Sequence, residues 1–227
     1  MRPDDPNLPN LRIIAAALGG LREEMVFVGG AVAGLLVSDP LAEPVRATVD
    51  VDAVVQATLG RFHRIEEDVA ACGFVRDIQS GVICRWVHRE SGVVFDLMPV
   101  EADVLGFSNR WYAYALDTAV PVDLGDGLGI RCVSAVAFVA TKLEAFAGRG
   151  AGDILGSHDL EDVLNIVDGR PELATELSAA PVEVRSAVAS AFAGLLEHRD
   201  FANALPGLIA EPDRAGFVLQ RLKGMSL

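Results

Sequence analysis

The hydrophobic positions of this 227-residue chain recur first at helical spacing and then in short runs typical of buried strands. LRIIAAAL follows Pro9 and Asn10, which can open a helix, and two glycines then end it. The apolar run MVFV stops at another glycine pair. The pattern predicts helix at 11–18, strand at 25–28, helix at 31–38, strand at 49–55 and helix at 62–73.

From Phe74 onward the pattern becomes rich in β-branched and aromatic residues. FVRDIQ, GVICRWVH and VVFDLMPV predict strands, and RESG between the last two is a plausible hairpin turn. Alternation in the third segment places Phe95 and Leu97 on the core face and Asp96 on the opposite face. GIRCVS predicts a final strand. Residues 107–127 stay unassigned: RWYAYAL fits either strand or helix, and DLGDGLG predicts a turn region.

The remaining sequence predicts helices. Ser134 can cap a helix over VAFVATKLEAFAG, which glycines 148 and 150 would end, and Ser157 can cap a second one over HDLEDVLNIVDG. Residues 171–227 are alanine-rich and also predict helix. We therefore expect an α+β fold: a mixed β-sheet flanked by helices, followed by a C-terminal helical region packed on it.

Composition limits the classes of function. A hydrophobic content of 51% supports a full core, with residues 1–133 predicted as the α/β domain and 134–227 as the helical one. A net charge of -13 argues against coating nucleic acid through bulk charge. The three cysteines and four histidines lack the spacing of a disulfide framework or zinc site. No secretory signal or spanning segment is recognisable, so we expect a cytoplasmic protein without a membrane role.

Two aspartates interrupt the valine-rich segment ATVDVDAVV. Side chains alternate across a strand, so Asp50 and Asp52 share one face and need compensation by hydrogen bonds, a cation or a metal. Mg²⁺ suits such a pair, because it prefers oxygen ligands and completes its shell with water and substrate phosphates. If the strand carrying Asp96 lies alongside, three carboxylates line one side of the sheet and could hold one or two ions.

Gly29 and Gly30 stand where a strand ends and a helix begins. Glycines there allow close backbone approach to a phosphate, whose charge the helix N-terminus favours. The alternative interpretation is structural: an acidic pair on a strand is often only a solvated face.

VGG, RATVDVD at 46–52 and FDLMP at 95–99 together resemble the nucleotidyltransferase fold of polymerase-β-like enzymes. More narrowly, IRCVSAVAFVATKLEAFAGR and HDLEDVLNI are similar to the AbiEii toxin-type family, including the MenT-like nucleotidyltransferase toxins. The resemblance spans roughly residues 25–168.

The resemblance implies a role for each matching residue. It makes Asp50, Asp52 and Asp96 the ligands of Mg²⁺, and Asp96 also a group that helps to deprotonate the acceptor. Lys142 would neutralise triphosphate charge and act in catalysis. The implied nucleotide-binding residues are Gly29, Gly30, Thr48, Lys142, Asp159 and Asp162, and Arg46 matches a position flanking the acidic pair.

The expected function is therefore Mg²⁺-dependent transfer of a nucleoside monophosphate from an NTP to an acceptor hydroxyl. By resemblance the acceptor is a tRNA or a protein, and the chain could be the toxin of a pair with a cognate antitoxin. Two alternatives stay open: a non-catalytic nucleotide- or partner-binding module with the same fold, and transfer to a small molecule such as an antibiotic.

Overall fold

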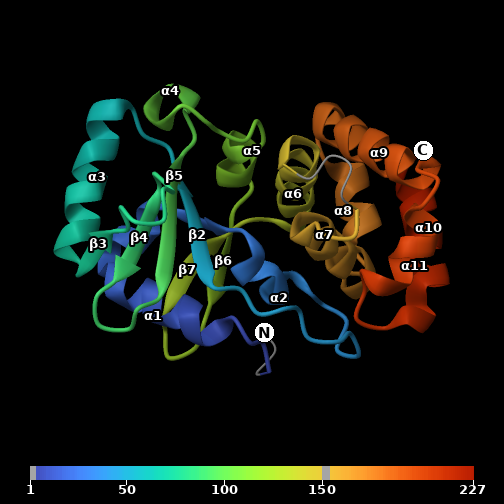
Figure 1. The fold of residues 1–227 in the computed structure, drawn as a ribbon, viewed down its shortest axis with the longest axis horizontal. Coiled ribbons are helices and arrows are strands. Elements are labelled where there is room, and N and C mark those ends of the chain that lie inside the picture. The colour runs from blue at the N-terminus through green and yellow to red at the C-terminus, as the bar shows by residue number, and fades with distance from the viewer. Residues whose placement is uncertain (1–3, 150–153) are drawn as a thin grey trace. The chain divides into compact units, whose positions relative to one another are not determined.

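The computed structural model describes residues 4–149 and 154–227 (Figure 1). They divide into two compact units. The sheet unit contains Asp5–Val32 and Arg46–Ser134, and the helical unit contains Ala33–Val45 and the described residues from Ala135 to Leu227. The segment Ala33–Val45, which the sequence analysis placed in the first domain, thus groups with the helices.

The described part of the sheet unit forms one seven-stranded mixed sheet, which confirms the α+β prediction. The strands are β1 (Val26–Val28), β2 (Asp50–Val55), β3 (Phe74–Arg76), β4 (Arg85–His88), β5 (Val94–Pro99), β6 (Val120–Asp123) and β7 (Gly129–Cys132). Their order is β3-β4-β5-β2-β1-β7-β6. At the centre, β2 runs parallel to β5 and antiparallel to β1.

Helices and helical turns connect these strands. They are α1 (Leu8–Leu18), η1 (Gly19–Glu24), η2 (Gly30–Val32), α3 (Leu59–Ala71), α4 (Ala102–Leu105) and α5 (Tyr112–Asp117). The α1 helix begins before Pro9, because a proline in the first turn lacks only an N–H that would have no partner there. The unassigned stretch 107–127 contains α5 and β6, so it is both helix and strand.

The strand alternation is as predicted. Val51 and Ala53 in β2 are fully buried, and they stand beside Phe95 and Leu97 in β5, which are also fully buried. Burying these apolar side chains stabilises the sheet by about 1.5–3 kcal/mol for each large residue. The opposite face of β2 carries both aspartates, so the apolar face fixes the direction in which they point.

The helical unit is built from α2 (Ala33–Leu36), α6 (Ala135–Arg149), α7 (His158–Gly169), α8 (Leu173–Ala179), α9 (Val182–Glu197), α10 (Phe201–Ala204), η3 (Leu205–Gly207), η4 (Pro212–Arg214) and α11 (Ala215–Met225). The α7 helix packs against α2, α6 and α11. The predicted cap is confirmed, since the Ser157 hydroxyl accepts a hydrogen bond from the backbone N–H of Leu160. The predicted break at Gly148 is wrong: α6 continues to Arg149, because one interior glycine lowers helix stability by only about 1 kcal/mol. Gly150 lies outside the described residues.

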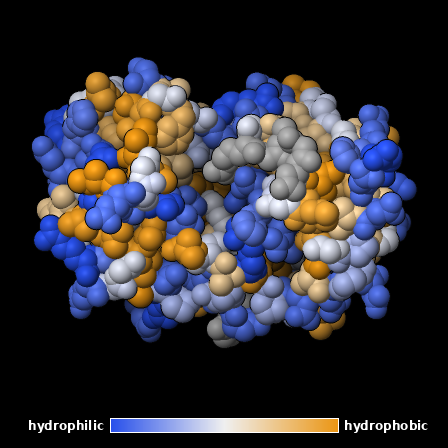
Figure 2. All heavy atoms as spheres, viewed as in Figure 1, coloured by the Kyte–Doolittle hydropathy of each residue, from blue (hydrophilic) through white to orange (hydrophobic). Residues whose placement is uncertain are grey.

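The surface of the sheet unit mixes residue types. Ile78 and Ile83, between β3 and β4, are exposed. Figure 2 shows hydrophobic side chains interrupted by hydrophilic ones over the elements of this unit. No helix within residues 4–149 or 154–227 is long and apolar enough to cross a membrane.

Candidate functional site

The three strand aspartates lie on one side of the sheet, at adjacent positions of two parallel strands. Asp52 of β2 stands in register with Asp96 of β5, and Asp50 precedes Asp52 by two residues on the same strand face. The sequence analysis made this arrangement conditional on β2 and β5 being neighbours, and the pairing confirms it. We call these three side chains the acidic face.

Gly29 ends β1 directly beside Asp52. Val28 pairs with Asp52 across the antiparallel β1–β2 ladder, and Gly29 follows with a φ of +70°. A Cβ atom at position 29 would lie 1.9 Å from Oδ2 of Asp52, so only glycine leaves room for this carboxylate. The predicted glycine turn therefore lies against the acidic face, and Gly30 begins η2 immediately after it.

Arg85, which the sequence analysis did not single out, joins two of the three aspartates. It stands opposite Asp96 across the antiparallel β4–β5 ladder. Its Nε donates to Oδ1 of Asp96 at 2.9 Å, and one terminal nitrogen lies 2.7 Å from Asp96 Oδ2 and 3.0 Å from Asp50 Oδ2. Such two-point contacts between a guanidinium and a carboxylate are among the stronger charged hydrogen bonds in proteins.

Burial increases the strength of these charge contacts. The side chain of Asp96 is 8% exposed and that of Asp50 is 29% exposed. The hydrogen bond to Asp96 raises the pKa of Arg85, although burial acts in the opposite direction. Next to it, burial and, to a smaller extent, the negative charges of Asp96 and Asp52 raise the pKa of the Cys84 thiol to about 11. With three carboxylates and one guanidinium, the acidic face has more negative than positive groups.

The acidic face differs from a complete three-carboxylate metal centre. Asp96 is held on the β4 side by Arg85, whereas the Asp52 carboxylate lies against Gly29 on the β1 side. Within the described ranges, no three His, Cys, Asp or Glu side chains form a group that could hold a metal ion. Asp50 and Asp52 still offer the oxygen donors that Mg²⁺ prefers, and Mg²⁺ commonly binds through only one or two carboxylates. The missing Cβ at Gly29 makes room for the Asp52 carboxylate, and the two carboxylates together suit one Mg²⁺ whose other positions water or substrate phosphates would fill.

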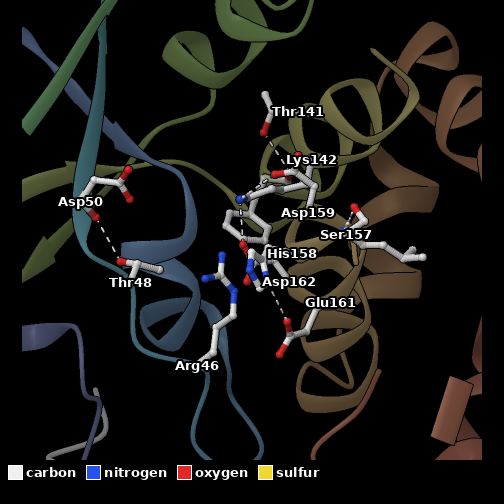
Figure 3. Close-up of polar contacts among 12 residues, drawn as sticks. Arg46, Thr48, Asp50, Thr141, Lys142, Ser157, His158, Asp159, Glu161 and Asp162 are labelled. Atoms are coloured by element: carbon white, nitrogen blue, oxygen red, sulfur yellow. Dashed lines mark hydrogen bonds and ion pairs between the residues drawn. The ribbon is translucent and has the colours of Figure 1, made fainter. Parts of the chain in front are cut away.

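The segment before β2 is fixed by Asn7, another residue that sequence reasoning missed. The Asn7 side chain donates to the Arg46 carbonyl at 3.0 Å and accepts from the Thr48 N–H at 2.8 Å. The Thr48 hydroxyl donates to the carbonyl of Asp50 at 3.0 Å (Figure 3). Asn7 is buried, so these bonds hold the start of β2 and with it the position of Asp50.

The other residues implied by the resemblance meet in the helical unit. Lys142 of α6 points toward Asp159 and Asp162 of α7, as Figure 3 shows, with its Nζ 3.1 Å from Asp159 Oδ1 and 2.7 Å from Asp162 Oδ2. The Asp162 side chain is only 1% exposed. The two acids are three residues apart on one helix face, and the packing of α6 on α7 brings Lys142 to them. The predicted residues thus form two groups, one in each unit.

Comparison with known proteins finds similarity at the level of structure. No family model matches the chain, and no curated protein matches its sequence. Among solved structures, the chain is similar to JHP933 from Helicobacter pylori, with 11% sequence identity and a TM-score of 0.48. The match covers 96% of this chain and 89% of that one. This similarity carries no conclusion about activity.

Proposed function

We propose that this chain is a Mg²⁺-dependent nucleotidyltransferase that transfers a nucleoside monophosphate from an NTP to an acceptor hydroxyl. The observation that carries the proposal is the combination of Asp52 in register with Asp96 and the Gly29 turn against Asp52. A solvated acidic face accounts for aspartates on a strand, but it does not require a glycine with φ of +70° to make room for one of them.

The proposed chemistry uses the residues of the acidic face. Asp50 and Asp52 would hold Mg²⁺, which supplies charge stabilisation to the reacting phosphate. The acceptor oxygen forms a bond to the α-phosphorus, the bond to the β-phosphate oxygen breaks, and pyrophosphate leaves with the electron pair. We assign the hydroxyl proton to Asp96, as the family resemblance implies. An ionised carboxylate has about four lone-pair sites, and Arg85 uses only part of them.

The remaining assignments rest on the resemblance to AbiEii and MenT-like toxins, and they are part of the same proposal. Gly29, Gly30 and Thr48 would contact the nucleotide. The resemblance also assigns nucleotide binding to Lys142, Asp159 and Asp162, which form a group of their own in the helical unit. The acceptor would be a tRNA or a protein, in the cytoplasm, and a cognate antitoxin would control the activity. A small molecule such as an antibiotic is the alternative acceptor.

One observation favours a second function. Arg85 already pairs with both Asp50 and Asp96 and compensates part of their negative charge, as it would in a purely structural ion-pair network. With that role, the chain would be a non-catalytic module that binds a nucleotide or a partner protein without turnover.

Label transfer separates the two functions. The protein is incubated with α-³²P-labelled NTPs, Mg²⁺ and either total tRNA or cell extract, and labelled acceptor is measured. We expect transfer that is lost in Asp52→Asn and kept in Asp103→Asn, a matched change at an exposed carboxylate of α4. Transfer by Asp52→Asn at the wild-type rate would refute the proposed site. Mg²⁺-dependent NTP binding without transfer would support the module.

A further inference from the structure

Arg85 occupies the side of the acidic face where a second cation would be expected. A guanidinium between two carboxylates reduces their mutual repulsion, as a bound divalent ion does. Arg85 contacts Asp96 through two nitrogens and Asp50 through one of the same two, with distances of 2.7–3.0 Å. The pairing of β4 with β5 places Arg85 opposite Asp96, and the Arg85 side chain is mostly buried. The backbone of the sheet therefore fixes the position of this contact.

We propose that Arg85 is a positioning residue that takes the place of a second metal ion, so that the acidic face binds one divalent ion, at Asp50 and Asp52, and not two. This inference rests on the proposed function, because it concerns the same acidic face. It also changes the expected role of Asp96, which is oriented by Arg85 and does not ligate metal in the free enzyme.

The charge balance supports a single ion. The three carboxylates and one guanidinium have a net charge of −2, which one divalent cation neutralises. A second divalent ion would have to approach Asp96 against the positive charge of Arg85, which lies 2.7 Å from its carboxylate. Removing Arg85 leaves three carboxylates on one side of the sheet, and that set favours a second cation.

Counting bound Mn²⁺ by electron paramagnetic resonance, without nucleotide, tests this directly. We expect about one Mn²⁺ per wild-type chain and about two per Arg85→Met chain, because the variant frees the Asp96 carboxylate and adds negative charge. Arg61→Met is the matched control: it removes an arginine that pairs with Glu24 at an exposed position, and it should keep the wild-type count.

A double variant protects the test against misfolding. Arg85→Met alone leaves Asp96 largely buried without its guanidinium, which can destabilise the sheet unit. Arg85→Met with Asp96→Asn removes both partners, and we expect it to return to about one Mn²⁺ per chain, because the acidic face then has two carboxylates. Thermal unfolding of each variant verifies that the counts refer to folded protein.

The outcomes separate this inference from the proposed function. Two Mn²⁺ per wild-type chain, or an unchanged count in folded Arg85→Met, would overturn the role of Arg85 and leave the metal-dependent function standing. No Mn²⁺ in the wild type, or an unchanged count in Asp52→Asn, would overturn the metal site and with it both proposals. Rescue offers a last check: Arg85→Lys keeps one positive charge and should stay near one ion, although an ammonium cannot reproduce the two-nitrogen contact with Asp96.

Discussion

Replacing Gly29 by alanine tests the geometry on which the proposed site depends. A residue other than glycine at φ of +70° is strained by about 1–2 kcal/mol. The new Cβ would also lie 1.9 Å from Oδ2 and 2.9 Å from Cβ of Asp52, so the Asp52 side chain must leave its position. Turning the carboxylate away relieves the contact with Oδ2 but not the one with Cβ, so the backbone must shift as well, and together these changes add about 1 kcal/mol. We therefore expect Gly29→Ala to lower the free energy of unfolding by about 2–3 kcal/mol.

Gly92→Ala is the matched control for this experiment. Gly92 has nearly the same φ, +73°, but no atom lies within 4 Å of the position its Cβ would take. It should therefore show only the backbone strain, about 1–2 kcal/mol, in urea unfolding followed by circular dichroism.

Function provides the sharper comparison between the two glycine variants. Gly29→Ala displaces the Asp52 carboxylate, so Mn²⁺ binding and nucleotide transfer should fall at least tenfold, a loss of about 1.4 kcal/mol in binding free energy. Gly92→Ala should keep both. If folded Gly29→Ala bound Mn²⁺ and transferred label as well as Gly92→Ala, the carboxylate of Asp52 would have no part in the site.

Three further predictions concern stability, each measured by urea unfolding. Lys142→Met removes the ammonium 2.7 Å from nearly fully buried Asp162 and should destabilise the protein by about 3 kcal/mol; a smaller loss in the double variant with Asp162→Asn would confirm that the buried charge is the cause. Ser157→Ala removes the acceptor for the Leu160 N–H and should cost about 1 kcal/mol, whereas no change would show that the cap does not stabilise α7. Burial raises the pKa of Cys132 to about 12 from 9.0. The unfolded chain therefore releases this proton first, and stability should fall as pH rises above 9, by about 1 kcal/mol at pH 10; the part of the decline due to this thiol should be absent in Cys132→Ala.

The acidic face could be predicted because strand geometry is strict. A period of two fixes which side chains share a face, so the apolar partners of Asp50, Asp52 and Asp96 determined where the acids point. The domain division was harder. Nothing local marks Ala33–Val45 as part of the helical unit; it is held there by contacts such as the hydrogen bonds from the N–H groups of Ser38 and Asp39 to the Gly169 carbonyl, far along the chain.

Arg85 was missed although the sequence held a signal for it. The RESG turn at 89–92 places His88 opposite Val93, and counting back along both strands then pairs Arg85 with Asp96. The register of a hairpin thus predicts the partner of a strand aspartate. Composition and motif spacing do not, because they treat each strand separately.

The two interpretations of the acidic face differ in which residue they leave unexplained. A structural ion pair explains why Asp50 and Asp96 stand among apolar residues, since Arg85 supplies the compensating charge that carboxylates in such surroundings require. It does not explain why β1 ends in a glycine. Only a residue without a Cβ can lie so close to the Asp52 carboxylate. A metal and phosphate site needs both features: a carboxylate whose position is fixed, and a backbone turn without a side chain beside it. The pair formed by Gly29 and Asp52, more than the number of acids, is therefore where the proposed catalytic site and a structural ion-pair network make different predictions.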